Sequence, residues 1–444
     1  MKKILCLSTI LFMFIASPAN NKQDIKEDNS KTHASSVKFK KFRFGSYGEI
    51  LGQYLFFTPN YASYSKTTKD LNQNGSLQKE SAILSLPRLN LAFDYKFSTS
   101  WAMGAEFSIK AGGTGQALEY EYGEGIETEA EMEKGGSVEI EQLYFTKTFS
   151  KTAQLRAGSM VIPVGMTNAY REPLNYFTSH RPMGESKLIP TTWSEIGLAF
   201  MGENRNFQYQ AMIVNGLNPL GFTGDAWISQ SSKDFVDVSQ FNSPAYVLRL
   251  GYSGVKGLKL GLSLYHNPNS FKNLEKRHEY KASFRGAISI GSIDALYQNK
   301  GIIARGSILL GKINNIDAVN TLTAPNLLKY NQHNALGNNM TYNIEVGYDI
   351  VQHFNKKYKL YPFVNHNFYK YNNTFINLNN RDLSEDRKYN VNTFTYGINY
   401  KPSKEIAIKL DYTNTKIKDN LNNKLNPENQ LGLSIAYSGW FFSK

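Results

Sequence analysis

The sequence predicts an all-β fold, a transmembrane antiparallel β-barrel of sixteen strands. Three observations lead to this prediction. From Arg43 onward, segments of about ten residues alternate apolar and polar side chains, as strands do when one face is apolar and the other is wet. The connections between these segments alternate between short and long. After residue 19, no apolar run is long enough to form a membrane-spanning helix.

The first nineteen residues read as a cleaved signal peptide. Lys2 and Lys3 precede an apolar stretch, 4–16, and small residues follow up to Ala19, near which cleavage is expected. Cys6, the only cysteine, lies inside this segment. The exported chain therefore has no thiol, and we expect neither disulfides nor a cysteine metal site.

Residues 20–42 predict a flexible polar tail on the periplasmic side. This segment holds six lysines against Asp24, Glu27 and Asp28, and it lacks any periodicity. The tail contributes to a formal net charge of +13. No Gly-rich phosphate loop, zinc-ligand spacing or RNA-binding aromatic motif accompanies this charge, so we expect no nucleic-acid partner.

The barrel itself is expected over residues 43–444. The predicted strands, in chain order, are 43–57, 83–97, 101–112, 137–149, 153–163, 191–201, 206–215, 245–252, 258–267, 279–292, 300–313, 341–351, 359–370, 390–400, 405–416 and 429–442. Alternation is clearest in 258–267, where leucines occupy every second position. It breaks at 290–293, which leaves counts of fourteen or eighteen strands open.

The connections predict the orientation of the barrel. Outer-membrane barrels have short periplasmic turns and long outer loops, and an even strand count leaves both termini in the periplasm. The chain is therefore expected in the outer membrane of a Gram-negative bacterium, in contact with membrane lipid and lipopolysaccharide. The long connections are 58–82, 113–136, 164–190, 216–244, 314–340 and 371–389.

Five short motifs resemble the phosphate-selective porin O/P family. They are Phe44–Glu49, Val138–Gln142, Arg156–Gly158, Pro163–Gly165 and Ile189–Trp193. The resemblance is dense over residues 43–202 and architectural beyond them. It implies a sixteen-stranded porin, a homotrimer, whose third long loop folds into the pore and which passes small hydrophilic solutes or phosphate-like anions.

By this resemblance the third long loop, 164–190, forms the pore constriction. An arginine fork suits oxyanions because it donates two hydrogen bonds, and cations at a narrow throat attract anions. The alternative is that this loop lies outside the barrel with solvated charges. The candidate constriction residues are Tyr170, Arg171, Glu172, His180 and Arg181.

Strand parity predicts which arginines line the pore wall. Nine basic side chains, five arginines and four lysines, and nine acidic ones are predicted on this face, so the wall is balanced and a general or weakly anion-favouring pore is expected. The predicted acids include Glu106, Glu141, Glu345 and Asp411. A carbohydrate-permeable pore stays open, because Tyr170, Tyr176, Phe177 and Trp193 could stack on sugars. The predicted wall arginines are Arg88, Arg156, Arg249, Arg285 and Arg305.

Catalysis, metals and cofactors are not expected. No nucleophile elbow or helix-borne metal motif occurs, and the scattered histidines lack metal-ligand spacing. The seven glutamates within 119–134 are expected in a solvated outer loop. A surface adhesin or structural barrel that acts through its long loops remains the alternative to a pore.

Overall fold

Sixteen antiparallel strands close into one barrel in a computed structural model of the chain. The structure describes residues 41–56, 80–114, 119–122, 128–131, 136–224, 226–229, 241–273, 285–321, 334–354, 357–376, 383–420 and 428–443. The predicted signal peptide and residues 20–40 of the predicted tail lie outside these ranges. The predicted fold class is confirmed, and counts of fourteen and eighteen strands are excluded.

Each barrel strand pairs with its neighbour along the chain, and β1 closes the barrel against β18. The strands are β1 (Phe42–Phe56), β2 (Glu80–Lys96), β3 (Trp101–Lys110), β6 (Ser137–Thr148), β7 (Gln154–Val161), β8 (Ser194–Asn204), β9 (Phe207–Val214), β10 (Ala245–Tyr252), β11 (Leu258–Asn267), β12 (Ile288–Asn299), β13 (Ile302–Ile313), β14 (Asn338–Tyr348), β15 (Lys359–Ile376), β16 (Leu383–Lys401), β17 (Ile406–Asp419) and β18 (Glu428–Ser443).

Short elements lie in the connections. Two strands from the glutamate-rich segment, β4 (Glu119–Tyr122) and β5 (Thr128–Glu131), form a separate two-stranded sheet within the connection between β3 and β6. The helical turns are α2 (Met166–Ala169), η2 (Pro173–Asn175), α3 (Met183–Leu188), η3 (Pro219–Gly221) and η4 (Ser270–Asn273). No helix in the described ranges is long and apolar enough to cross a membrane.

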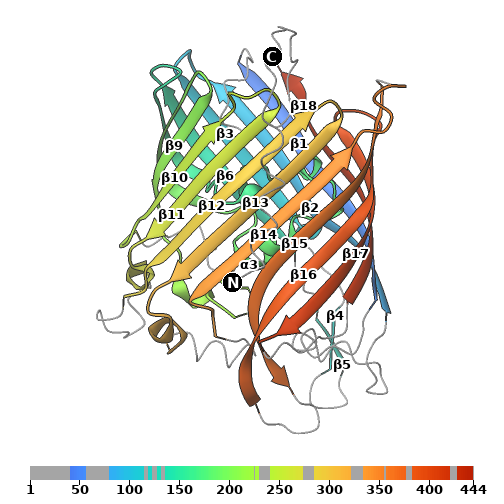
Figure 1. Ribbon diagram of the computed structural model, residues 1–444. Coiled ribbons are helices and arrows are strands. Elements are labelled where there is room, and N and C mark those ends of the chain that lie inside the picture. Colours follow the sequence, from blue (N-terminus) through green and yellow to red (C-terminus); the bar gives the residue numbers. More distant parts are fainter. Residues whose placement is uncertain are drawn as a thin grey trace, which may run out of the picture. The chain divides into compact units, whose positions relative to one another are not determined.

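The connections segregate by length (Figure 1). The connections β2–β3, β6–β7, β8–β9, β10–β11 and β12–β13 are short. They lie at the end of the barrel that also holds the C-terminus, here called the short-turn end. The strand ends that the longer connections join lie at the opposite end, here called the long-loop end. This segregation follows from strict up-and-down pairing of neighbouring strands.

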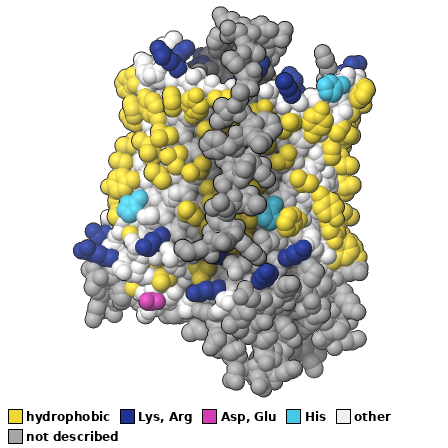
Figure 2. Space-filling model, in the orientation of Figure 1, with side chains coloured by type: hydrophobic (Ala, Val, Ile, Leu, Met, Phe, Trp, Pro, Cys, Tyr) yellow, Lys and Arg dark blue, Asp and Glu magenta, His cyan; other side chains and the backbone are white. Residues whose placement is uncertain are grey.

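The outward face of the barrel is apolar. Figure 2 shows hydrophobic side chains in a band over the visible face, with Lys and Arg side chains toward its two edges. Leu262, Leu310 and Leu433 are typical of this band, at 37%, 53% and 51% exposed. A continuous belt of exposed leucines raises the free energy of a protein in water. In a membrane the same surface contacts hydrocarbon and is not hydrated, so the belt favours a lipid environment.

The inward face is not polar throughout, which corrects the expectation that every inward position faces a wet lumen. Toward the long-loop end of β7–β13 the inward side chains are apolar and pack against two connections that enter the barrel. Trp193 and Trp227 are fully buried in this core, and the Trp193 ring lies 4.7 Å from that of Tyr265. Trp227 lies over Gly311, where a Cβ atom would approach its ring to 2.0 Å.

The tenth predicted strand was wrong in position: 279–292 was expected, and β12 runs from Ile288 to Asn299. The reason is the inner core. Ile288 and Ile290 point inward into apolar surroundings, whereas Ser292 and Asp294 point inward among polar groups. One face of β12 therefore changes from apolar to polar along its length, and no single alternation describes it.

Candidate pore constriction

The third long loop, residues 162–193 between β7 and β8, lies inside the barrel. Its polar groups bind inward-facing carboxylates on strands from separate parts of the wall. Arg171 pairs with Glu106 on β3, and the Ser179 backbone N–H donates to Asp411 on β17. The loop therefore crosses the lumen, and its charges are not solvated outside the barrel.

Asn168 holds the base of the loop together. Its side-chain amide donates to the carbonyl oxygens of Val164 (3.2 Å) and Pro190 (3.0 Å), and its oxygen accepts the Trp193 backbone N–H at 3.0 Å. These three bonds join the departing and returning chain. The loop consequently enters the lumen as a closed unit rather than as two independent segments.

Glu185 of α3 ties this base to the wall. Its carboxylate accepts the Thr167 backbone N–H at 2.7 Å and the Ser307 hydroxyl of β13 at 2.6 Å. Gly165 makes the approach possible: its φ is 78°, and a Cβ atom there would lie 2.8 Å from a Glu185 oxygen. The glycine of the Pro-Val-Gly motif is thus required by both conformation and space.

Arg171 is fixed between two glutamates. Its guanidinium pairs with Glu106 and, at 3.4 Å, with Glu141 of β6. Burial alone would lower the pKa of Arg171, but Glu106, Tyr47 and Glu141 outweigh it and raise that pKa above its ordinary value. Arg171 therefore stays charged, and its charge is matched at close range instead of being presented to the lumen.

Glu106 is the most heavily bonded carboxylate of this part of the wall. Besides Arg171, it accepts the Tyr47 hydroxyl (2.6 Å) and the amides of Asn90 and Gln142, each at 2.9 Å. Such a carboxylate, 0% exposed, is stable only when its oxygens are satisfied in this way. Glu106 thus forms a rigid anchor for the loop.

A bulge brings Glu141 and Gln142 to the same side of the wall. The β3–β6 register shifts between Glu106 and Phe107, so both consecutive β6 residues are buried. The sequence contains the signal for it. Val138 and Ile140 face outward on one parity, and Leu143 and Phe145 face outward on the other.

A second group of contacts holds Tyr176. Its hydroxyl donates to Glu49 at 3.2 Å and accepts from Arg88 at 3.1 Å, while Arg88 also pairs with Glu49 at 3.0 Å. The Lys409 ammonium lies 4.1 Å from the centre of the Tyr176 ring. Tyr176 is therefore held by charged groups from β1, β2 and β17 together.

Phe177 fixes the loop to the opposite wall. Its backbone N–H donates to both oxygens of Glu345, at 3.1 and 3.0 Å, and Arg305 pairs with the same carboxylate. Its ring packs on Tyr361 and Phe363, with centroids 5.1 and 5.5 Å away. This anchor combines a charge-assisted hydrogen bond with aromatic packing.

The return of the loop is held by β17. Asp411 accepts both the backbone N–H and the hydroxyl of Ser179, and Lys409 donates to the carbonyl oxygens of Pro173 (2.7 Å) and Thr178 (3.0 Å). On β18, Gly432 leaves room for this contact, because a Cβ atom there would lie 2.2 Å from the Ser179 hydroxyl oxygen.

The remaining predicted constriction residues lie in the same loop but differ in surroundings. Glu172 accepts the Ser438 hydroxyl at 2.6 Å. His180 is half-buried, and burial lowers its pKa below the ordinary value of 6.5. Arg181 is half-buried and forms no ion pair with any residue that the structure describes. Tyr170 is half-buried, with the Arg249 guanidinium 5.9 Å from its ring centre.

Four of the five predicted wall arginines point inward and have close partners. Arg88 pairs with Glu49, Arg305 pairs with Glu345, Arg249 binds both oxygens of Asp294, and Arg156 stacks 3.9 Å above Tyr144. The fifth, Arg285, is exposed in the connection ahead of β12 and is not part of the wall. That correction has the same cause as the misplaced tenth strand.

Three of the four aromatics considered for sugar stacking are packed. Trp193, Phe177 and Tyr176 are 0%, 1% and 5% exposed. Their ring faces contact the inner core, the Tyr361–Phe363 pair and Lys409, respectively. Only Tyr170 of this set is half-buried, so the structure offers no aromatic platform from these residues.

Several functional contacts were absent from the predicted constriction. The anchoring carboxylates Glu106, Glu141, Glu345 and Asp411 were predicted only as wall residues by parity, and Tyr47 was not singled out. Glu106 and Glu141 pair with the Arg171 side chain, and Glu345 and Asp411 accept backbone N–H groups of the loop; neither kind of pairing has a local sequence signal. It depends on how far the loop reaches across the barrel.

Comparison with known proteins gives distant likenesses. No family model matches the chain. A protein of Aquifex aeolicus (strain VF5), described as uncharacterized, is 26% identical over 346 residues, which are 78% of this chain and 73% of the relative.

Three solved outer-membrane proteins resemble the fold. A loop L8 deletion mutant of OmpT from Vibrio cholerae has a TM-score of 0.48 at 10% identity and covers 90% of this chain and 100% of its own. The outer membrane channel DcaP of Acinetobacter baumannii has a TM-score of 0.46 at 10% identity (90% and 98% covered). Salmonella typhi OmpF in complex with daunomycin has 0.46 at 11% (89% and 97%). These likenesses assign no family, and the resemblance to phosphate-selective porins stays a prediction.

Proposed function

We propose that this protein is an outer-membrane porin that lets small hydrophilic solutes diffuse through its barrel. The observation that carries the proposal is the third long loop, which crosses the lumen and is fastened to carboxylates of β1, β3, β6, β14 and β17. A narrowing that is anchored on several sides sets a fixed size limit for solutes. The apolar outward belt supports a lipid environment.

The charge arrangement supports a pore of weak selectivity. Arg88, Arg171 and Arg305 each have a carboxylate partner at short range, so their fields largely cancel along the passage. Of the loop's arginines, Arg181 is the better candidate for a bias toward anions. A specific phosphate site would need several guanidinium groups that donate hydrogen bonds to the same position. The guanidinium groups of Arg88, Arg171 and Arg305 instead pair with carboxylates.

The proposed orientation places the short-turn end in the periplasm and the long-loop end outside. The proposed assembly is a homotrimer, as the family resemblance implies. Chemical cross-linking of the detergent-extracted protein, followed by mass determination, tests the assembly. Protease or biotin labelling of intact cells at the long-loop end tests the orientation.

A planar-bilayer recording tests the function. The purified full chain is added under a KCl gradient, and folding is verified by its heat-modifiable migration in gels. Steady conductance steps with a reversal potential near zero are expected. A silent bilayer with correctly folded protein would overturn the pore and favour a surface adhesin or structural barrel.

A further inference from the structure

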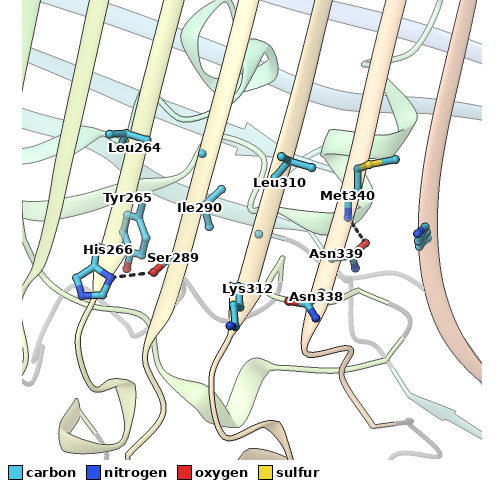
Figure 3. A pocket seen from close by; sticks show the side chains of 13 residues that line it. Leu264, Tyr265, His266, Ser289, Ile290, Leu310, Lys312, Asn338, Asn339 and Met340 are labelled. Carbon is cyan, nitrogen blue, oxygen red and sulfur yellow. Dashed lines mark hydrogen bonds between the residues drawn. The ribbon is translucent and has the colours of Figure 1, made fainter. Parts of the chain in front are cut away.

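A groove of about 620 Å³ runs over the outward face of β11–β14, near the long-loop end (Figure 3). Gly291 of β12 lies at its centre, in register with Leu264 of β11 on one side and Leu310 of β13 on the other. Met340 of β14 follows Leu310 in the same row. The groove is therefore an apolar notch between two leucine side chains.

The notch exists because of Gly291. A Cβ atom at this position would contact only the Leu264 Cδ2 atom, at 3.6 Å, so the space above it is open. Leu264 and Leu310 are 44% and 53% exposed on either side. An apolar depression flanked by exposed leucines on the outward side of the barrel matches the chemistry of an acyl chain.

One row closer to the long-loop end, the same strands carry polar groups. The row reads His266, Ser289, Lys312 and Asn338 across β11–β14, in direct register. The His266 ring nitrogen and the Ser289 hydroxyl are 2.9 Å apart (Figure 3). Lys370 of β15 also lines the groove. The apolar row through Gly291 and the polar row through Ser289 are thus two residues apart along each strand.

The described charges on the outward strand faces around the groove are all positive, whereas Asp317, in the connection after β13, is exposed. Among the side chains described on the outward faces of β11–β17, none is acidic: the described carboxylates Asp294, Glu345 and Asp411 point inward and are buried. The outward cations toward the long-loop end are Lys312, Lys370, Lys388, Lys416 and Lys418. A lipid-facing surface with this charge attracts phosphate-bearing headgroups.

We propose that the groove binds one phosphorylated acyl lipid. One acyl chain lies in the notch over Gly291, and the phosphate contacts Lys312 and Lys370, with the His266–Ser289 pair at its edge. The inference rests on the proposed membrane setting but not on conductance. A barrel that fails to conduct could still hold the lipid, so the two proposals fail separately.

Native mass spectrometry of the full chain tests the proposal. The detergent-solubilised protein is incubated with phosphatidic acid and with phosphatidylcholine of the same acyl chains, and in a parallel arm with lipid A. Wild type should retain the phosphate-exposed lipids, phosphatidic acid and lipid A, in preference to phosphatidylcholine. Lys312→Gln with Lys370→Gln should weaken retention by about fivefold for each lysine.

Two variant pairs make the test specific. Gly291→Leu fills the notch and should abolish retention. Gly306→Leu should not, because Gly306 lies on the outward face of β13 nearer the short-turn end, where a Cβ atom makes only ordinary contacts. Lys416→Gln with Lys418→Gln removes two outward lysines outside the groove and should leave retention unchanged. Heat-modifiable migration verifies that each variant is folded.

Three results would overturn the proposal. Retention that survives both Gly291→Leu and the Lys312/Lys370 double variant would exclude this groove. Equal retention of phosphatidylcholine and phosphatidic acid would exclude recognition of an anionic headgroup. Displacement of the lipid by inorganic phosphate would assign the lysines to a free phosphate ion instead of a lipid.

Discussion

Arg171 and Glu106 stand 65 positions apart in the chain and form a buried ion pair inside the barrel. Arg171 belongs to the third long loop and Glu106 to β3, so this pair joins the loop to the wall. Glu106 also accepts hydrogen bonds from Tyr47 and Asn90. The pair is therefore part of a connected network rather than an isolated contact, and it makes the loop's position testable by substitution.

Arg171→Gln should destabilise the barrel and loosen the loop. It leaves Glu106 and Glu141 as neighbouring buried carboxylates without Arg171, and removing one partner of a buried pair costs about 3–5 kcal/mol. We expect a lower temperature for heat-modified migration and a shift of the reversal potential toward cation preference. Arg171→Gln combined with Glu106→Gln should recover part of the stability. An unchanged transition temperature in the single variant would contradict the anchoring role.

Arg181→Gln should lower any chloride preference without affecting stability much. Arg181 is half-buried and has no ion-pair partner among the described residues, so its charge is the least compensated of the loop's two arginines. The reversal potential under a KCl gradient measures the change. Arg285→Gln is the matched control, because Arg285 is exposed outside the barrel wall. Equal effects of the two variants on the reversal potential would show that Arg181 does not set the ion selectivity of the constriction.

Gly432→Val should displace the loop. Even the first added carbon would lie 2.2 Å from the Ser179 hydroxyl oxygen, so the Ser179–Asp411 contact could not persist. Overpacking of this kind costs roughly 1–3 kcal/mol. Single-channel conductance should change together with stability. Gly306→Val, where the space is open, should leave both as in wild type, and identical traces from Gly432→Val would refute a fixed loop.

His180 should make the barrel less stable in acid. Burial lowers its pKa in the folded protein, so its contribution is fully present above the unfolded value of 6.5 and is lost as pH falls through 6.5 toward the folded value. His180→Gln removes this contribution. The loss of stability between pH 7.5 and pH 5 should be smaller in the variant than in wild type, as measured by heat-modified migration. An equal loss would mean that His180 does not titrate with unfolding.

Trp227→Ala should destabilise the barrel without changing selectivity. The ring is fully buried over Gly311, and its Nε1 donates to the Leu336 carbonyl oxygen at 2.9 Å. Deleting a large buried aromatic costs about 3–5 kcal/mol. The denaturant midpoint should fall, while the reversal potential should stay unchanged. A changed reversal potential would show that the inner core borders the permeation path.

The barrel is predictable from the sequence because contact with lipid requires an apolar side chain at every second strand position. The outward residues from Leu258 to Leu264 face hydrocarbon and are all leucine, so alternation is strict there, and the predicted and observed bounds of this strand coincide. The bounds of β12 were not predictable in this way, because Ile288 and Ile290 are apolar residues that face inward and pack in the apolar core inside the barrel. That core is assembled from connections distant in sequence.

The sequence by itself determined the closed antiparallel barrel and the inward position of Arg88, Arg156, Arg249 and Arg305, since these follow from a period of two residues. Only the tertiary structure decided that Arg171 is neutralised by Glu106 and Glu141. Charge compensation depends on which groups meet within a few ångströms, and residues brought together by barrel closure and loop insertion carry no common period in the chain.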